Sequence, residues 1–131
     1  MDSRTSEPDE GSQPGAPPVQ VGAFLDQMRE VGLESMVDEA FRIYLRDAPA
    51  RIERLRSALG DADATATASA AHALKSASLN VWAVVLARLL QEVESAGGSA
   101  DLGRASGLLA PVEEELSRVT SFLSGRLAGG G

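Results

Sequence analysis

Cysteine is absent from this chain of 131 residues, and histidine, tryptophan and tyrosine occur once each. The absence of cysteine excludes disulfide bonds and thiol catalysis, and it fits a reducing compartment such as the cytoplasm. One histidine without cysteine offers too few ligands for zinc, so we expect no metal site. Three phenylalanines are the only other aromatic residues, so the core has to be aliphatic, and the 44% hydrophobic content is sufficient for one.

Basic residues and long apolar runs are also scarce. Twelve Lys and Arg against 19 Asp and Glu give a net charge of −7, which argues against nucleic acid or an anionic membrane as a partner. No apolar run reaches the length of a membrane-spanning helix, and residues 1–20 lack a basic segment followed by an apolar one. We therefore expect a cytoplasmic protein without an anchor or a signal peptide.

The two ends of the chain differ in composition from its centre. Residues 1–20 contain four acids, four prolines, two glycines and almost nothing apolar, which predicts a disordered tail or linker. Residues 128–131 are expected to be flexible. The remaining residues, 21–127, are expected to form one folded domain. A linker-like N-terminus fits both a free-standing protein and a piece of a longer kinase.

Within residues 21–127 apolar residues recur every three or four positions, which is typical of helices, and no segment alternates like a strand. The predicted helices span about residues 23–31, 33–59, 64–79, 81–96 and 100–127. Pro49 and Pro111 lie inside the second and fifth, where each is expected to cause a kink or a break. Short connections favour antiparallel neighbours. The sequence therefore predicts an all-α, antiparallel up-down four-helix bundle with a short extra N-terminal helix.

The only histidine lies in an unusual segment, residues 65–80, which reads TATASAAHALKSASLN and contains no acidic residue. On a helical wheel His72 points roughly 150° away from the centre of an apolar stripe. That stripe consists of Ala66, Ala70, Ala73, Leu74, Ala77 and Val81. Lys75 and Leu79 share the outward face, and the i, i+3 spacing brings the Lys75 ammonium beside the imidazole. The pattern predicts an exposed, positively charged and open site that suits phosphate, although a lone surface histidine most often has no special role.

The stretch AHALKSASLNVWAVVLARLLQEVESAG resembles the signature of histidine-containing phosphotransfer domains of bacterial phosphorelays. The family pattern is roughly His-x-Leu-Lys-(Gly/Ser)-small-small-x-Asn-(Leu/Ile/Val)-Gly-Ala-x-x-Leu. The matching residues are His72, Leu74, Lys75, Ser76, Ala77, Ser78, Asn80, Val81, Ala83 and Leu86. The resemblance covers about residues 23–127. It implies that His72 is the phosphorylated residue and that Lys75 steadies the phosphoryl group.

The resemblance also implies a partner, the receiver domain of a response regulator or of a hybrid sensor histidine kinase. A neutral imidazole is a nucleophile near pH 7 and can attack an aspartyl phosphate. The sequence around His72 offers no acidic cluster for a divalent metal, so we expect the receiver to supply magnesium and most catalytic groups. No glycine-rich phosphate loop occurs, so the chain is expected to be a relay intermediate rather than an enzyme, with no cofactor of its own.

Leu79 is expected to provide an apolar docking contact, while Ala68, Ala71 and Ser76 keep the neighbouring surface low. Where the family usually has glycine, this chain has Trp82. The indole is predicted to pack inward, but on the docking surface it would obstruct the receiver. Two alternatives therefore remain beside active phosphotransfer: a helical adaptor without phosphoryl chemistry, and a degenerate phosphotransfer domain that binds a partner without accepting phosphate.

Overall fold

The structure is a computed structural model that describes residues 32–129. Its helices are α2 (Glu34–Gly60), α3 (Ala64–Leu79), α4 (Val84–Gly98), α5 (Leu102–Gly107) and α6 (Leu109–Gly129). The part described contains no strand. The predicted helix at residues 23–31 and the predicted tail at residues 1–20 lie outside the described residues.

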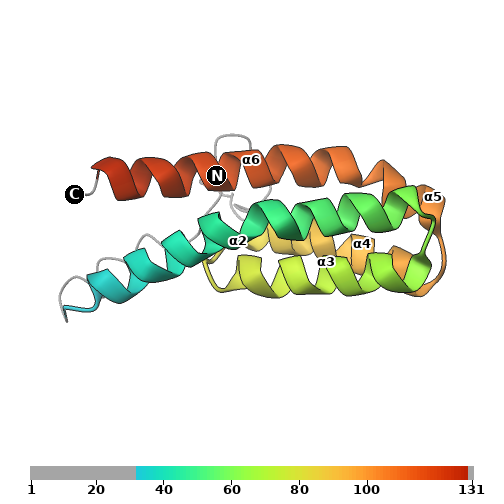
Figure 1. The fold of residues 1–131 in the computed structure, drawn as a ribbon, viewed down its shortest axis with the longest axis horizontal. Coiled ribbons are helices and arrows are strands. Elements are labelled where there is room, and N and C mark those ends of the chain that lie inside the picture. The colour runs from blue at the N-terminus through green and yellow to red at the C-terminus, as the bar shows by residue number, and fades with distance from the viewer. Residues whose placement is uncertain (1–31, 130–131) are drawn as a thin grey trace, which may run out of the picture.

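Four long helices lie side by side, and the short α5 connects α4 to α6 at one end (Figure 1). Helix α3 packs against α2 and α4, while α6 packs against the same two helices from the other side. This arrangement confirms the predicted all-α four-helix bundle. None of the helices in residues 32–129 is both long and apolar enough to span a membrane.

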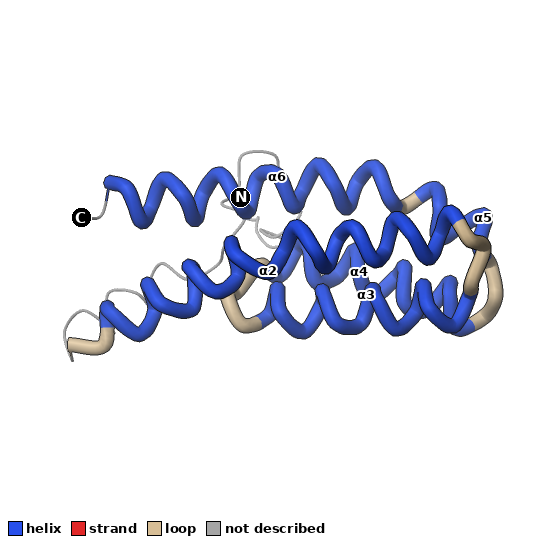
Figure 2. The backbone as a smooth tube through the Cα atoms, viewed as in Figure 1, coloured by secondary structure: helices blue, strands red, loops and turns tan. Residues whose placement is uncertain are grey.

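Helix α2 is continuous through Pro49, so the helix does not break there. Figure 2 shows the tube of α2 changing direction part-way along its length. Proline explains the bend, because it has no N–H to donate and its ring crowds the preceding turn. The first part of α2 and the last part of α6 extend beyond α3 and α4 (Figure 1).

The core is aliphatic, as predicted, apart from buried Phe41 and Tyr44. The largest fully buried side chains are Phe41, Leu55, Leu74, Leu86, Leu90 and Leu123. They come from α2, α3, α4 and α6, so each long helix contributes to one common core. Burying a side chain of this size contributes about 1.5–3 kcal/mol.

The buried face of α3 differs from the predicted stripe. The residues of α3 that are buried are Thr67, Ala71, Leu74 and Ser78. Four alanines of the predicted stripe are only half-buried: Ala66, Ala70, Ala73 and Ala77. Leu74 and Val81 are buried as predicted, and Ala70 and Ala77 pack against the edge of the core. The predicted stripe was wrong in leaving out Thr67, Ala71 and Ser78. Ser78 is buried because its hydroxyl has a partner, the Tyr44 hydroxyl at 2.9 Å.

The helix ends agree with the prediction at some points only. Asp63 caps α3, since its carboxylate accepts a hydrogen bond from Ala66 N at 3.0 Å. Asp101 caps α5, where its carboxylate accepts a hydrogen bond from Arg104 N at 3.2 Å. Helix α4 begins at Val84, three residues later than predicted, because a tight turn follows α3.

The last predicted helix is split into α5 and α6 at Leu108. Pro111 is the third residue of α6, where a backbone N–H has no partner within the helix. Proline is tolerated at such a position, so it marks the start of α6 instead of interrupting it.

Candidate functional site

His72 lies in the middle of α3, and 58% of its side chain is exposed. The other exposed residues on this face of α3 are Thr65, Ser69, Ser76 and Leu79. The outward direction predicted for His72 is therefore observed. The imidazole is open to an approaching molecule, and the hydroxyl-bearing and small side chains around it leave space.

A carboxylate that the sequence analysis missed contacts the imidazole. Glu94 on α4 places Oε2 3.0 Å from His72 Nδ1 and Oε1 2.9 Å from Lys75 Nζ. The sequence analysis looked for an acidic cluster among the neighbours of His72 along the chain, so it did not anticipate this single carboxylate from another helix. Residues 72 and 94 are each eleven positions from Ala83, so folding α3 and α4 back on each other about that residue would have suggested the contact.

The charge of Glu94 determines which imidazole nitrogen is free. The nearby Lys75 ammonium lowers the pKa of Glu94, and the contact with His72 adds to this effect while burial opposes it. Glu94 is therefore ionised at neutral pH and can only accept hydrogen bonds. His72 Nδ1 consequently donates to Glu94, which leaves the lone pair of Nε2 available on the other side of the ring.

Lys75 is less exposed than predicted. Only 18% of its side chain is accessible, because it lies across α4. Its Nζ donates to Gln91 Oε1 at 2.7 Å, and Gln91 Nε2 donates to Ser95 Oγ at 3.3 Å. The predicted positive charge beside the imidazole is therefore balanced by Glu94 at 2.9 Å, which corrects the expectation of a positively charged surface.

Comparison with known proteins identifies the family of this chain. A sequence model described as the Hpt domain matches residues 39–122. The chain belongs to the Hpt domain family. The structure is similar to the crystal structure of histidine-containing phosphotransfer protein B (HptB) from Pseudomonas aeruginosa PAO1, with a TM-score of 0.77 and 28% sequence identity. That match covers 87% of this chain and 97% of HptB. No curated protein matched the chain.

Membership in this family makes the chain a histidine phosphotransfer module of phosphorelays. Such proteins are phosphotransfer intermediates and not enzymes in the usual sense. The predicted docking residues of this Hpt domain lie at different depths. Ser76 and Leu79 are exposed on the face that carries His72, and Leu79 is 50% exposed. Ala68 is half-buried on the side of α3 that faces α4.

Helices α3 and α4 approach each other very closely near Ala68. A Cβ atom built on Gly97 would lie 2.9 Å from Ala68 N and 3.2 Å from Ala64 O. Only glycine fits at this position without a shift of backbone, because both neighbouring atoms are main-chain atoms. The contact lies one turn from the pair His72 and Glu94, so it helps to set the distance across which that pair forms.

Trp82 lies in the turn between α3 and α4, and its backbone has a φ of +59°. Residues other than glycine adopt this left-handed backbone conformation at a cost of about 1–2 kcal/mol, which explains why glycine suits this position in the family pattern. The indole is half-buried and packs against the core of the Hpt domain. Packing against the core offsets the backbone strain, and the predicted inward orientation is observed in part.

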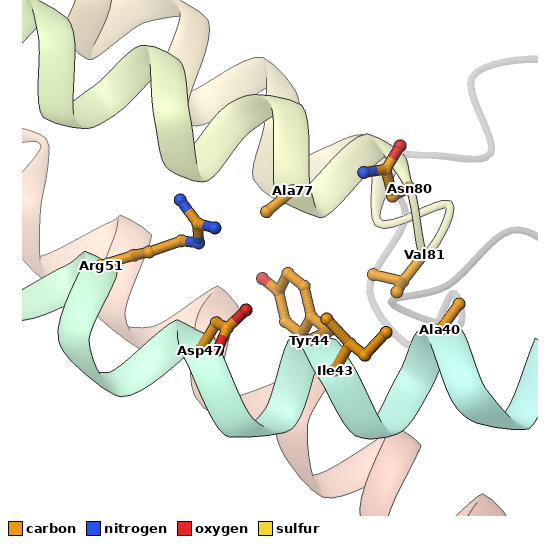
Figure 3. A pocket seen from close by; sticks show the side chains of 8 residues that line it. All are labelled: Ala40, Ile43, Tyr44, Asp47, Arg51, Ala77, Asn80 and Val81. Carbon is orange, nitrogen blue, oxygen red and sulfur yellow. The ribbon is translucent and has the colours of Figure 1, made fainter.

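A cavity of about 90 Å³ lies between α2 and α3, away from the face of His72. Figure 3 shows its lining residues, Ala40, Ile43, Tyr44, Asp47, Arg51, Ala77, Asn80 and Val81. None of the predicted site residues lines it. Within residues 32–129 no three His, Cys, Asp or Glu side chains group together to hold a metal ion.

Proposed function

We propose that His72 is the phosphoryl acceptor and donor of this Hpt domain, and that it exchanges the phosphoryl group with the aspartate of a receiver domain. The observation that carries the proposal is an exposed imidazole whose Nδ1 is 3.0 Å from the ionised Glu94. Histidine occurs once in the chain, so the family's chemistry has one candidate residue.

The reaction follows from the position of the lone pair. Nε2 of His72 attacks the phosphorus of the receiver's aspartyl phosphate, the N–P bond forms, and the P–O bond to the carboxylate breaks with its electrons on the carboxylate. The proton on Nδ1 remains in the hydrogen bond to Glu94. The imidazole gains positive charge during this step, and the carboxylate stabilises that charge at close range. Donation to a second receiver is the reverse reaction.

The partner supplies the remaining groups. A transferring phosphoryl group is stabilised mainly by positioning and by positive charge, commonly from a divalent metal. We assign magnesium to the receiver, and to Lys75 a supporting contact with the phosphoryl group. Ser76 and Leu79, with the accessible part of Ala68, provide a low docking surface around His72. The chain would act in the cytoplasm and would not phosphorylate itself.

A transfer assay tests the proposal. The protein is mixed with a receiver domain carrying labelled phosphate, and acid-labile, base-stable label is measured on the chain. Wild type should take up label, while His72→Gln should take up none and keep its helical content, because the site is exposed. Label on His72→Gln would contradict the proposal. Binding of the receiver without any label on wild type would favour the adaptor or the degenerate domain.

A further inference from the structure

The ammonium of Lys75 and the reactive edge of His72 face different ways. Lys75 Nζ lies 2.7 Å from Gln91 Oε1 and 2.9 Å from Glu94 Oε1, and both acceptors belong to α4. His72 also turns Nδ1 toward Glu94, so its Nε2 points away from α4. A phosphoryl group on Nε2 would therefore not meet the ammonium in the position that Lys75 occupies.

The carboxamide of Gln91 is fixed as an acceptor toward Lys75. Its Nε2 donates to Ser95 Oγ at 3.3 Å, which directs Oε1 toward Lys75. The reversed orientation would place two N–H donors against an ammonium that has only donors, so it is unfavourable. Ser95 and Gln91 are four residues apart, which places both on one face of α4.

We propose that Gln91 is a positioning residue that holds the Lys75 ammonium over α4, so that Gln91 competes with a phosphoryl group on His72 for this cation. The inference rests on the proposed role of His72 as the phosphoryl acceptor. The ammonium donates a hydrogen bond to Gln91 and forms an ion pair with Glu94. A phosphoryl group has to draw the ammonium away from at least one of these acceptors.

Gln91 is the acceptor whose removal gives a clear result. Glu94 contacts both His72 and Lys75, so changing it alters the imidazole as well. Gln91 is exposed and its hydrogen bonds go to Lys75 and Ser95, so replacing it frees the lysine without a direct change at His72 or in the core. Lys75 is also the only lysine in the chain, so a signal from a labelled lysine side chain is unambiguous.

The test measures the second ionisation of the phosphoryl group itself. The full chain is phosphorylated on the imidazole with phosphoramidate, which requires no receiver, and the ³¹P signal is followed against pH. A nearby cation favours the dianion and lowers the midpoint of this titration. In Gln91→Met the freed ammonium should lower the midpoint relative to wild type by a few tenths of a pH unit, because bringing a unit charge from far away to about 5 Å in water would lower it by about half a pH unit and the wild-type ammonium is already nearby.

Three further variants connect this shift to Lys75. In a Lys75→Met background, replacing Gln91 should no longer lower the midpoint. The double variant Gln91→Met with Lys75→Met should therefore have the same midpoint as Lys75→Met alone. Glu92→Gln is the control on the same helix, because Glu92 pairs with Arg104 at 3.8 Å and not with Lys75; its midpoint should equal that of wild type. The labelled lysine signal should change more on phosphorylation in Gln91→Met than in wild type.

An unchanged or raised midpoint in Gln91→Met overturns the inference, as does a shift that persists when Lys75 is replaced. These outcomes do not depend on a receiver. If the receiver assay fails but the expected ³¹P shifts are observed, the proposed function is rejected, while the inferred contact between Lys75 and the phosphoryl group stands. Successful transfer without the shifts would reject the role of Gln91 alone.

Discussion

At the scale of single residues, Glu94 connects His72 and Lys75, the two side chains of α3 that we propose to act in phosphotransfer. Glu94→Gln keeps an oxygen that can accept from His72 Nδ1, but it removes the charge that stabilises the imidazole in the reaction. We expect phosphotransfer to slow about tenfold, equivalent to about 1.4 kcal/mol of lost stabilisation. Glu94→Ala removes the hydrogen bond as well and should be slower. Rates from a phosphorylated receiver measure both, and equal rates for wild type and Glu94→Ala would contradict the role of this carboxylate.

The buried phenol of Tyr44 should make the protein less stable in alkaline solution. Burial raises the pKa of Tyr44 from 10.0 to about 12, against a smaller opposing effect of its hydrogen bond to Ser78. The folded state therefore keeps the proton longer than the unfolded state, and its advantage is complete below pH 10. As the pH rises from 10 to about 12, up to roughly 3 kcal/mol of the free energy of unfolding should be lost.

Tyr44→Phe isolates this effect, because the chain has no other tyrosine. The variant should lose about 1–3 kcal/mol at neutral pH, since the buried Ser78 hydroxyl loses its partner at 2.9 Å. Its loss of stability between pH 10 and 12 should be smaller than that of wild type. Chemical unfolding at several pH values measures both quantities, and parallel curves for the two proteins would show that the phenol does not titrate as described.

At the scale of helices, Gly97 controls the spacing of α3 and α4. Gly97→Ala would place a methyl group 2.9 Å from Ala68 N, so one helix has to move. We expect a loss of about 1–3 kcal/mol in stability, together with slower transfer, because the contact between His72 and Glu94 lies one turn away. Gly98→Ala is the matched control. A Cβ there meets nothing within 4 Å, and alanine stabilises a helix by up to about 1 kcal/mol over glycine. Similar melting temperatures for the two variants would contradict the close approach.

In the turn between α3 and α4, the packing of Trp82 stabilises the fold while its strained backbone destabilises it. Trp82→Gly loses the packing of a half-buried indole but relieves a φ of +59°. Trp82→Ala loses the same packing and keeps the strained backbone. Both variants should be less stable than wild type, and Trp82→Ala should be less stable than Trp82→Gly by about 1 kcal/mol. Equal stability of these two variants would contradict the backbone strain. Faster transfer in both would place the indole on the docking surface.

At the scale of the whole molecule, periodicity predicted what depends on neighbours along the chain. It gave the exact bounds of α3 and the exposure of His72, since both follow from the repeat of a single helix. It missed Glu94 and Gln91, because their contacts depend on the register between two helices. It also misjudged Ser78, whose burial depends on a hydroxyl contributed by a distant residue of α2. The polarity of a residue therefore does not exclude it from the core where, as at Ser78, a distant side chain supplies a hydrogen-bond partner.

The whole molecule also contains residues 1–20, which the composition predicts to contribute nothing to the core. This segment has almost no apolar side chains, so it cannot bury enough surface to offset the entropy of ordering. A chain that begins at residue 21 should therefore keep its melting temperature and its rate of phosphotransfer. The control is removal of residues 1–31, which also deletes the predicted amphipathic helix with Phe24, Leu25, Met28 and Val31. That larger deletion should lower stability, because its apolar residues lose any surface they bury. A large loss from the shorter deletion would mean that the acidic segment docks on the domain.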